Sequence, residues 1–417
     1  MMTKSARGFL WDNLLSMSAY WALAGTAVSS VCAYWDISLP VSNILVGLTG
    51  TLPIAQLAGS LFYARTRHPR RFVLGVNLLW RCFLPLAFLT VLLPAGGGLL
   101  FGVLYPLAVL LYQLAIPVQN SWMAMHVSSG APKDYYALRE MSFMLAYSVA
   151  FCGVNLLLAR GQAGGTLGTS YVQIGLLMSV PLAASLAALW LLPREMPAAQ
   201  KNRPAAALRT VWQNRDFRAV LLLNMGFSFC SVLVGSYATL YQVQVLKVNF
   251  LTLMICALAG NLLRAWATML AGRAAAVRGW SPVLCAGMLV FAAAGCVWLH
   301  MNDANRLWAY PLVSVLGGLP YAATGIGFLQ LQIETTPNAD RSNYFAVVAA
   351  CTGIAALAGT SVCSAMIGAA QKLGVELRWL FLPGIICLIA CALAALALRP
   401  GWKPARRAGN ETADAGK

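Results

Sequence analysis

Two arginines lie deep inside long apolar runs, and of all side chains in the sequence theirs are the clearest candidates for a chemical role. Arg81 and Arg264 each stand well inside a run of about 20 largely apolar residues. A lone charge at bilayer depth costs at least about 2.5–3.5 kcal/mol, so each guanidinium should face a protein interior or a partner. We expect no acid to pair with them, because Asp36, Glu140 and Glu334 fall at the ends of such runs. An unpaired guanidinium can bind a carboxylate through two parallel hydrogen bonds.

Polar and aromatic side chains repeat at helical spacing along three other apolar runs. On the run 99–123 they recur every seven residues, which keeps them on one face of a helix. On the runs 219–242 and 307–333 they stand three and four residues apart. Stripes of this kind line solute cavities or hold membrane helices together, and the sequence leaves both interpretations open. The predicted substrate-binding set comprises Arg264, Tyr105, Tyr112, Gln113, Gln119, Asn224, Ser228, Tyr321 and Thr324.

The sequence holds none of the common catalytic motifs. It lacks an HExxH zinc motif, a P-loop, a GxSxG nucleophile turn and any pair of acids inside an apolar run. The 11 cysteines lie in apolar runs and form no CxxC motif, so we interpret them as small buried residues. We therefore expect no enzyme activity, no cofactor, no metal site and no disulfide.

The composition indicates a protein whose surface is covered by lipid. Of the 417 residues, 60% are hydrophobic and only 10% are charged, whereas a soluble domain has about a quarter of its residues charged. The net charge of +17 comes from basic residues in short loops between apolar runs. Anionic lipid headgroups and topology signals explain this placement, so we do not expect a nucleic-acid partner. The expected partners are the lipid bilayer and a small-molecule substrate, and we expect a monomer.

The apolar runs predict an all-α integral membrane protein with twelve transmembrane helices. Each run is long enough to cross a bilayer as a helix and lacks the alternation of a barrel strand. Residues 1–192 hold six runs, of which the first is 13–35, and residues 219–398 hold six more. Residues 193–218 form a polar, basic bridge between two pseudo-symmetric six-helix bundles, and residues 399–417 form a tail expected to be disordered.

The distribution of Lys and Arg predicts the orientation of the chain. If both termini are cytoplasmic, six basic residues of the bridge lie inside, together with the basic turn at 65–71. The outer loops then hold only Arg160, Lys247, Arg306, Lys372 and Arg378. Because short loops rich in Lys and Arg stay cytoplasmic, we expect both termini inside and a location in the plasma membrane.

A short motif follows the second run and returns in weaker form after the eighth. The first copy comprises Gly59, Leu61, Arg67, Arg70 and Arg71, and the second comprises Gly272 and Gly279. With twelve runs in two sets of six around a basic bridge, the chain resembles the major facilitator superfamily over essentially its whole length. Tyr63 and Ala276 stand where the family motif has acids, and the family's arginine motif of helix four and GPxxxGG motif of helix five are absent.

The resemblance implies a role for several of these residues. The two motif copies would form the gating loops of a transporter that works by alternating access. Helices one, four, seven and ten line the central cavity of that fold and helix eight flanks it, which would place Arg264 beside the substrate. Helix three is peripheral in that fold, so Arg81 is expected to bond backbone carbonyls.

Two functions of different classes follow from the sequence. The first is a secondary transporter for a small polar or aromatic organic solute, which Arg264 would favour as an anion. The second is a non-transporting membrane sensor or an embedded enzyme, suggested by the departures from the gating motif. The expected lack of an acid at mid-membrane depth disfavours simple proton symport.

Overall fold

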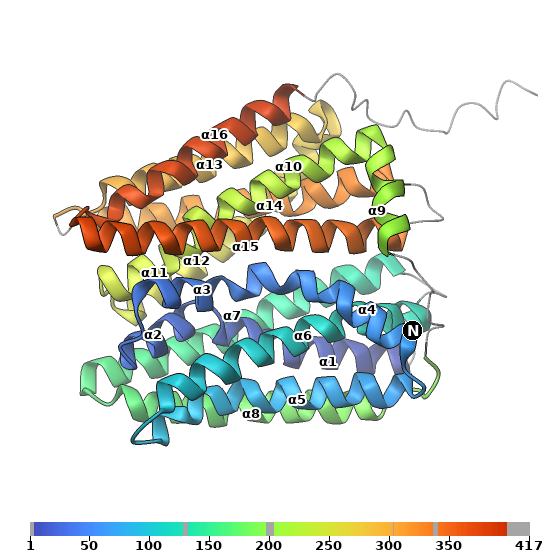
Figure 1. Cartoon of the computed structure of the whole chain (residues 1–417), viewed down its shortest axis with the longest axis horizontal. Coiled ribbons are helices and arrows are strands. Elements are labelled where there is room, and N and C mark those ends of the chain that lie inside the picture. The colour runs from blue at the N-terminus through green and yellow to red at the C-terminus, as the bar shows by residue number, and fades with distance from the viewer. Residues whose placement is uncertain (1–3, 128–131, 197–203, 303, 337–340, 398–417) are drawn as a thin grey trace, which may run out of the picture.

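The computed structural model describes residues 4–127, 132–196, 204–302, 304–336 and 341–397, and Figure 1 shows their arrangement. These residues are almost entirely helical, and no strand occurs among them. The expected tail at 399–417 and part of the bridge lie outside the described residues. The all-α prediction is confirmed.

The N-terminal half is built from eight helices. Their bounds are α1 Lys4–Leu23, α2 Thr26–Tyr34, α3 Leu39–Thr51, α4 Ala55–Arg65, α5 Pro69–Leu89, α6 Gly97–Val127, α7 Pro132–Gly164 and α8 Leu167–Trp190. The short 3-10 segment η1 (Leu52–Ile54) joins α3 to α4, and η2 (Thr90–Leu92) ends α5. Two of the predicted spans are therefore each formed by two consecutive helices.

The C-terminal half begins after a short helix in the bridge, α9 (Pro204–Gln213). Its seventh span runs from α10 (Arg215–Ser231) through the π-helical segment η3 (Val232–Ser236), α11 (Tyr237–Leu240) and the π-helical segment η4 (Tyr241–Val245). The remaining helices are α12 Phe250–Arg278, α13 Trp280–His300, α14 Arg306–Thr335, α15 Arg341–Leu373 and α16 Phe381–Ala397, with the 3-10 turn η6 (Leu377–Leu380) before α16.

The number of spans agrees with the sequence, but the first span begins earlier than predicted. Among the described residues, 11 helical runs are long and apolar enough to cross a membrane, and α1 with α2 forms a further span bent by 43°. The bend falls at Gly25, whose φ of 65° suits glycine. Because α1 starts at Lys4 rather than at residue 13, Asp12 lies inside the first span.

The helices form two bundles that lie one above the other in Figure 1, the N-terminal half below and the C-terminal half above. Within the lower bundle α1 packs on α7 and α8, and α5 packs on α6 and α8. Within the upper bundle α13 packs on α14 and α16, and α10 packs on α15. The halves meet chiefly along α3 with α15 and along α7 with α12.

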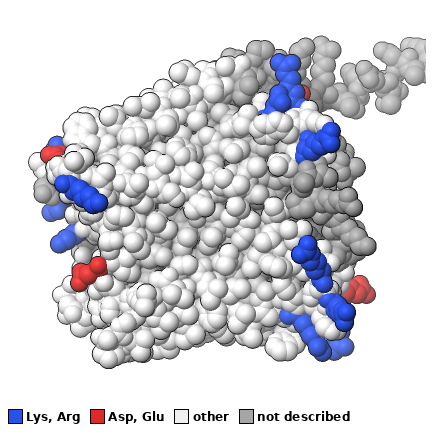
Figure 2. Space-filling model, viewed as in Figure 1, with Lys and Arg blue, Asp and Glu red and all other residues white. Residues whose placement is uncertain are grey.

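The two ends of the bundles are used below as points of reference. The terminal end is the one where α1 starts and α9 lies, and the opposite end is the one that holds α2 and α11 (Figure 1). On the face drawn in Figure 2, the charged side chains of the described residues gather at these two ends and leave an uncharged band between them. Such a band is what a multi-pass membrane protein presents to the hydrocarbon of a bilayer.

Candidate functional site

The two charged residues that the sequence singled out lie in different surroundings, and Arg264 is the more open of them. Arg264 stands near the centre of α12, and its Cζ lies 5.7 Å from the ring centroid of Tyr321 on α14. Tyr321 stands near the centre of its own helix, yet 36% of its surface is exposed. This pair is close enough for a cation–π interaction, and it leaves the guanidinium free to accept a further partner.

Other aromatic and small residues surround this pair. Phe291 of α13 lies 5.4 Å from the Tyr321 ring. A Cβ added at Gly235 would stand only 3.0 Å from the Tyr321 hydroxyl, so this glycine makes room for it. Tyr147 of α7 lies within electrostatic reach of Arg264. Because α7 belongs to the N-terminal half and α12 to the C-terminal half, both bundles contribute to the surroundings of Arg264.

Arg264 has no acidic partner in the part of the chain that the structure describes. No carboxylate there forms an ion pair with it, and the bond recorded at this residue is from the Thr268 hydroxyl to the Arg264 carbonyl, 2.9 Å. A guanidinium over the face of one tyrosine ring can still bind an anionic group bidentately while an organic ring stacks beside it. This arrangement is suited to a small organic anion.

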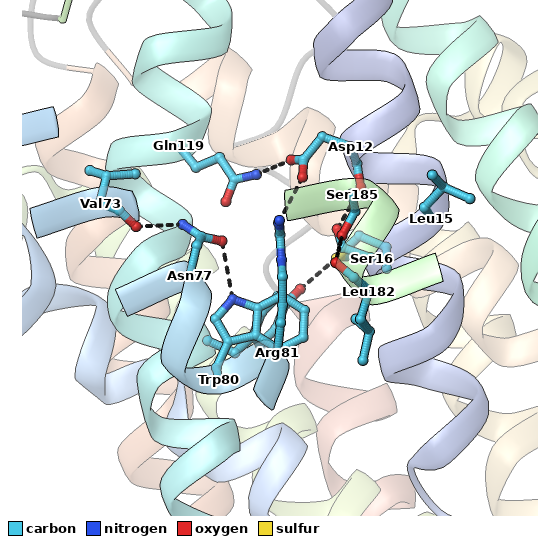
Figure 3. Close-up of polar contacts among 12 residues, drawn as sticks. Asp12, Leu15, Ser16, Val73, Asn77, Trp80, Arg81, Gln119, Leu182 and Ser185 are labelled. Atoms are coloured by element: carbon cyan, nitrogen blue, oxygen red, sulfur yellow. Dashed lines mark hydrogen bonds and ion pairs between the residues drawn. The ribbon is translucent and has the colours of Figure 1, made fainter. Parts of the chain in front are cut away.

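Arg81 is paired with an acid, which contradicts the expectation from the sequence. Its Nη2 donates to Oδ1 of Asp12 over 2.7 Å, and the Gln119 amide donates to Oδ2 of the same carboxylate (Figure 3). Arg81 is 4% exposed and Asp12 is 1% exposed. The prediction that Arg81 bonds backbone carbonyls was therefore wrong. The pair and Gln119 together join α1, α5 and α6 inside the N-terminal half.

The error came from the assigned start of the first span. A run beginning at residue 13 leaves Asp12 in the loop, whereas the helix from Lys4 carries it two turns into the bundle. The apolar residues Phe9, Leu10 and Trp11 just before it were the available signal. A buried carboxylate inside a span is a group that can carry a proton in a transport cycle. Asp12 therefore supplies the acid whose expected absence disfavoured proton coupling.

The predicted site residues of α6 make their contacts inside the N-terminal half. Tyr105 stacks on Phe101 with 5.7 Å between the ring centroids. The Tyr112 hydroxyl lies 2.6 Å from the Met17 sulfur, and Gln113 accepts from the Gln56 amide over 2.9 Å. Tyr105, Tyr112 and Gln113 are all buried. The structure thus brings this stripe to the polar cluster around Asp12 and into the bundle core, and the contacts found for it do not include Arg264.

The predicted residues of the C-terminal half differ in whether they contact Arg264. Tyr321 lies beside Arg264 as described above. Asn224 and Ser228 are half-buried on α10. Thr324 is buried, and its hydroxyl donates to the Pro320 carbonyl of its own helix over 2.9 Å. Of the nine predicted substrate-binding residues, the structure therefore brings Arg264 and Tyr321 into direct contact.

Gly59, Arg70 and Gly279 of the predicted gating loops have structural roles in the fold. A Cβ at Gly59 would stand 2.2 Å from the Leu114 carbonyl oxygen, so α4 can cross α6 this closely only at a glycine. Arg70 donates to the carbonyls of Trp190 and Leu192 at the end of α8, over 2.7 and 3.2 Å. The other predicted loop residues are the exposed Arg67 and Arg71, Gly279 with its φ of 80° in the turn before α13, and Gly272, which has open space around it.

Hydrogen bonds between the two halves occur toward the opposite end. The Gln244 amide of η4 donates to the Ser29 carbonyl of α2 over 2.8 Å. The Phe250 amide at the start of α12 donates to the Gln162 side chain over 3.3 Å. Asn43 of α3 donates to the Ser364 hydroxyl of α15 over 3.0 Å. These bonds connect the bundles between the candidate site and the opposite end.

Comparison with known proteins identifies the fold. No family model matches the chain, and no curated protein matches it in sequence. Among solved structures, the nucleoside transporter NupG is similar over 94% of this chain and 99% of its own, with 10% identity and a TM-score of 0.73. A D-xylose–proton symporter is similar over 95% and 98%, with 16% identity and a TM-score of 0.70. The xylose transporter XylE from E. coli, in an inward open conformation, is similar over 94% and 95%, with 17% identity and a TM-score of 0.66.

These similarities cover both bundles and nearly the full length of each chain. They confirm the resemblance to the major facilitator superfamily at the level of the fold, including the arrangement of two six-helix halves. The identities are too low to carry a substrate from one protein to another.

Proposed function

We propose that the chain, which has the major facilitator superfamily fold, is a secondary transporter for a small organic anion. The observation that carries this proposal is the Arg264 cluster. It combines a guanidinium that has no acidic partner among the described residues with the exposed ring of Tyr321, near the centre of the long helices. In transporters of this architecture the substrate site lies near the bilayer midplane between the two repeats.

The chemistry of the cluster favours a carboxylate or phosphate attached to a ring or chain. Arg264 would bind the anionic group, and Tyr321 and Tyr147 would contact the organic part, with the buried Phe291 supporting the Tyr321 ring. The solved relatives include transporters of nucleosides and of xylose, and one structure of a POT family transporter in complex with 5-aminolevulinic acid. The last ligand has both a carboxylate and a small organic chain, which is compatible with a site of this kind.

The contacts between the halves support an alternating-access cycle. The bonds Gln244–Ser29, Phe250–Gln162 and Asn43–Ser364 hold the halves together toward the opposite end. A substrate would then reach Arg264 from the terminal end in this conformation, and transport would require these bonds to break. We assign the basic bridge and turns, and with them both termini, to the cytoplasm, so that this route would open to the cytoplasm. We propose a location in the plasma membrane and a monomer.

The buried Asp12 carboxylate supplies an acid for coupling transport to protons. Its pairing with Arg81 and Gln119 would have to loosen when the carboxylate takes up a proton, because a neutral acid no longer attracts the guanidinium. The cluster would thereby link protonation to the packing of α1 against α5 and α6.

The proposal is tested by combining a binding screen with a flux assay. Purified protein is heated with a panel of aromatic and aliphatic carboxylates, phosphates and neutral sugars. A ligand at 100 times its Kd should add about 2.7 kcal/mol of stability. The best ligand is then offered to proteoliposomes that contain the protein. Anions should stabilise the protein and enter the vesicles, whereas a ligand that binds without entering would identify a sensor and contradict the transporter.

A further inference from the structure

A groove lies on the outside of the N-terminal bundle at the terminal end, away from Arg264 and Tyr321. It has a volume of about 730 Å³ and is formed by the first turns of α1 and the last turns of α8. The two helices cross closely beside it, since a Cβ at Gly8 would stand 2.7 Å from a Leu192 methyl group. The volume falls in the range of about 300–1,000 Å³ that is typical of small-molecule sites.

The side chains along α1 change in character from the terminal end inward. Lys4 and Arg7 come first, then Trp11, then Leu15, all lining the groove and spaced three or four residues apart on one helix face. The stripe spans about 16 Å at 1.5 Å per residue. Its other wall is apolar and includes Ala184 and Ala188 of α8. This order of basic, aromatic and aliphatic groups matches the headgroup, interface and hydrocarbon layers of one leaflet.

Exposed apolar residues beside the groove indicate that it opens to lipid rather than to water. Trp11 is 57% exposed, and Trp190 and Leu191 at the end of α8 are 63% and 87% exposed. The charged side chains among the described residues that line the groove are Lys4 and Arg7, and both are basic. A zwitterionic headgroup such as phosphocholine would bring a cation toward them, whereas phosphatidylglycerol carries only the negative charge of its phosphate.

We propose that this groove is a binding site for an anionic phospholipid of the leaflet at the terminal end. Lys4 and Arg7 contact the phosphate and the remaining headgroup charge, Trp11 lies at the level of the glycerol backbone, and one acyl chain follows Leu15 and Ala184. The site is independent of the transport proposal. Because Trp11 and Leu15 of the groove flank Asp12 on α1, lipid occupancy also fixes the part of α1 that carries the buried acid.

The test is a lipid titration of the purified full chain in a neutral detergent, followed by native mass spectrometry. The probes are phosphatidylglycerol and phosphatidylcholine with identical acyl chains. The wild-type protein should retain phosphatidylglycerol in preference. The variant Lys4→Gln/Arg7→Gln should bind it roughly 25-fold more weakly, at about fivefold per basic residue near the membrane surface. The control Arg273→Gln/Arg278→Gln removes two exposed basic residues at the same end and should bind as the wild type does.

A second pair of variants tests the acyl-chain part of the groove. Ala184→Trp fills it, and Ala183→Trp places the same ring on a neighbouring exposed position that does not line it. Binding should fall in the first variant and persist in the second. Three outcomes would each overturn the proposal. They are equal retention of both lipids, equal loss of binding in both tryptophan variants, and displacement of the lipid by free glycerol phosphate at comparable concentration.

Discussion

The buried pair of Asp12 and Arg81 gives the sharpest energetic prediction. Both side chains are almost fully buried, and the Arg81 Nε and Nη1 atoms already lack a hydrogen-bond partner. In Asp12→Leu the guanidinium would keep its charge and lose its main acceptor. Breaking a buried ion pair from one side costs about 3–5 kcal/mol, because the remaining charge stays desolvated. We therefore expect this variant to be strongly destabilised.

The reverse substitution should cost less. In Arg81→Met the Asp12 carboxylate keeps the hydrogen bond from Gln119 and can also become neutral by taking up a proton. The double variant Asp12→Leu/Arg81→Met removes both charges, and replacing a buried pair by apolar groups is often neutral or stabilising by about 1–4 kcal/mol. The double variant should therefore be more stable than Asp12→Leu alone.

The measurement is a double-mutant cycle on unfolding free energies in mixed micelles. Ser179→Ala serves as a control variant that leaves the ion pair intact. Ser179 is half-buried on α8, and its hydroxyl bonds a carbonyl of its own helix. Independent sites add within about 0.3–0.5 kcal/mol. If the two single effects add within that range, or if the double variant is the least stable of the three, the pair does not hold the half together as argued.

Four further predictions follow from the site and the fold. Arg264→Met should abolish binding of the anionic ligand and Arg264→Lys should weaken it, both with wild-type unfolding curves; ligand affinity unchanged in both would reject the site. Gly59→Ala should destabilise the protein by about 1–3 kcal/mol through the clash with the Leu114 carbonyl. Gly75 has open space around it, so Gly75→Ala should leave the stability unchanged or raise it by up to about 1 kcal/mol, and thermal unfolding measures both variants. A cysteine at Ala206 in α9 should react with impermeant reagents only from the cytoplasmic side, and labelling in intact cells would refute the topology. The variant Asp12→Leu/Arg81→Met should lose uptake driven by a proton gradient while keeping exchange of unlabelled for labelled solute, and gradient-driven uptake at the wild-type rate would make the pair purely structural.

The span pattern could be predicted because length and hydropathy determine it. In hydrocarbon the backbone must form its own hydrogen bonds, so each apolar run of spanning length predicts a helix. Twelve such runs around a basic bridge therefore predict two sets of six helices. The bend at Gly25 and the π-helical segments of the seventh span were not predicted, since they depend on packing between helices that are distant in sequence. Gly25, for instance, has Thr239 of α11 as its near neighbour.

The candidate site was only partly predictable for the same reason. Helical spacing placed Tyr105, Tyr112 and Gln119 on one face, but it could not tell whether that face met the space between the halves or the core of one half. The structure turns them toward Met17, Phe101 and Asp12. The role of Arg264 was inferred from its depth, and its contact with Tyr321 required the crossing of α12 with α14.

The central claim is that the two halves rock around a substrate bound at Arg264, and a reversible cross-link tests it most directly. Ser29 and Gln244 are bonded across the halves toward the opposite end. The variant Ser29→Cys/Gln244→Cys is reconstituted in proteoliposomes and oxidised, with each single variant treated identically to account for the native cysteines. Uptake of the best anionic ligand should stop on oxidation and return on reduction, while ligand binding persists throughout. Uptake that continues at the wild-type rate in the fully cross-linked protein would contradict the account.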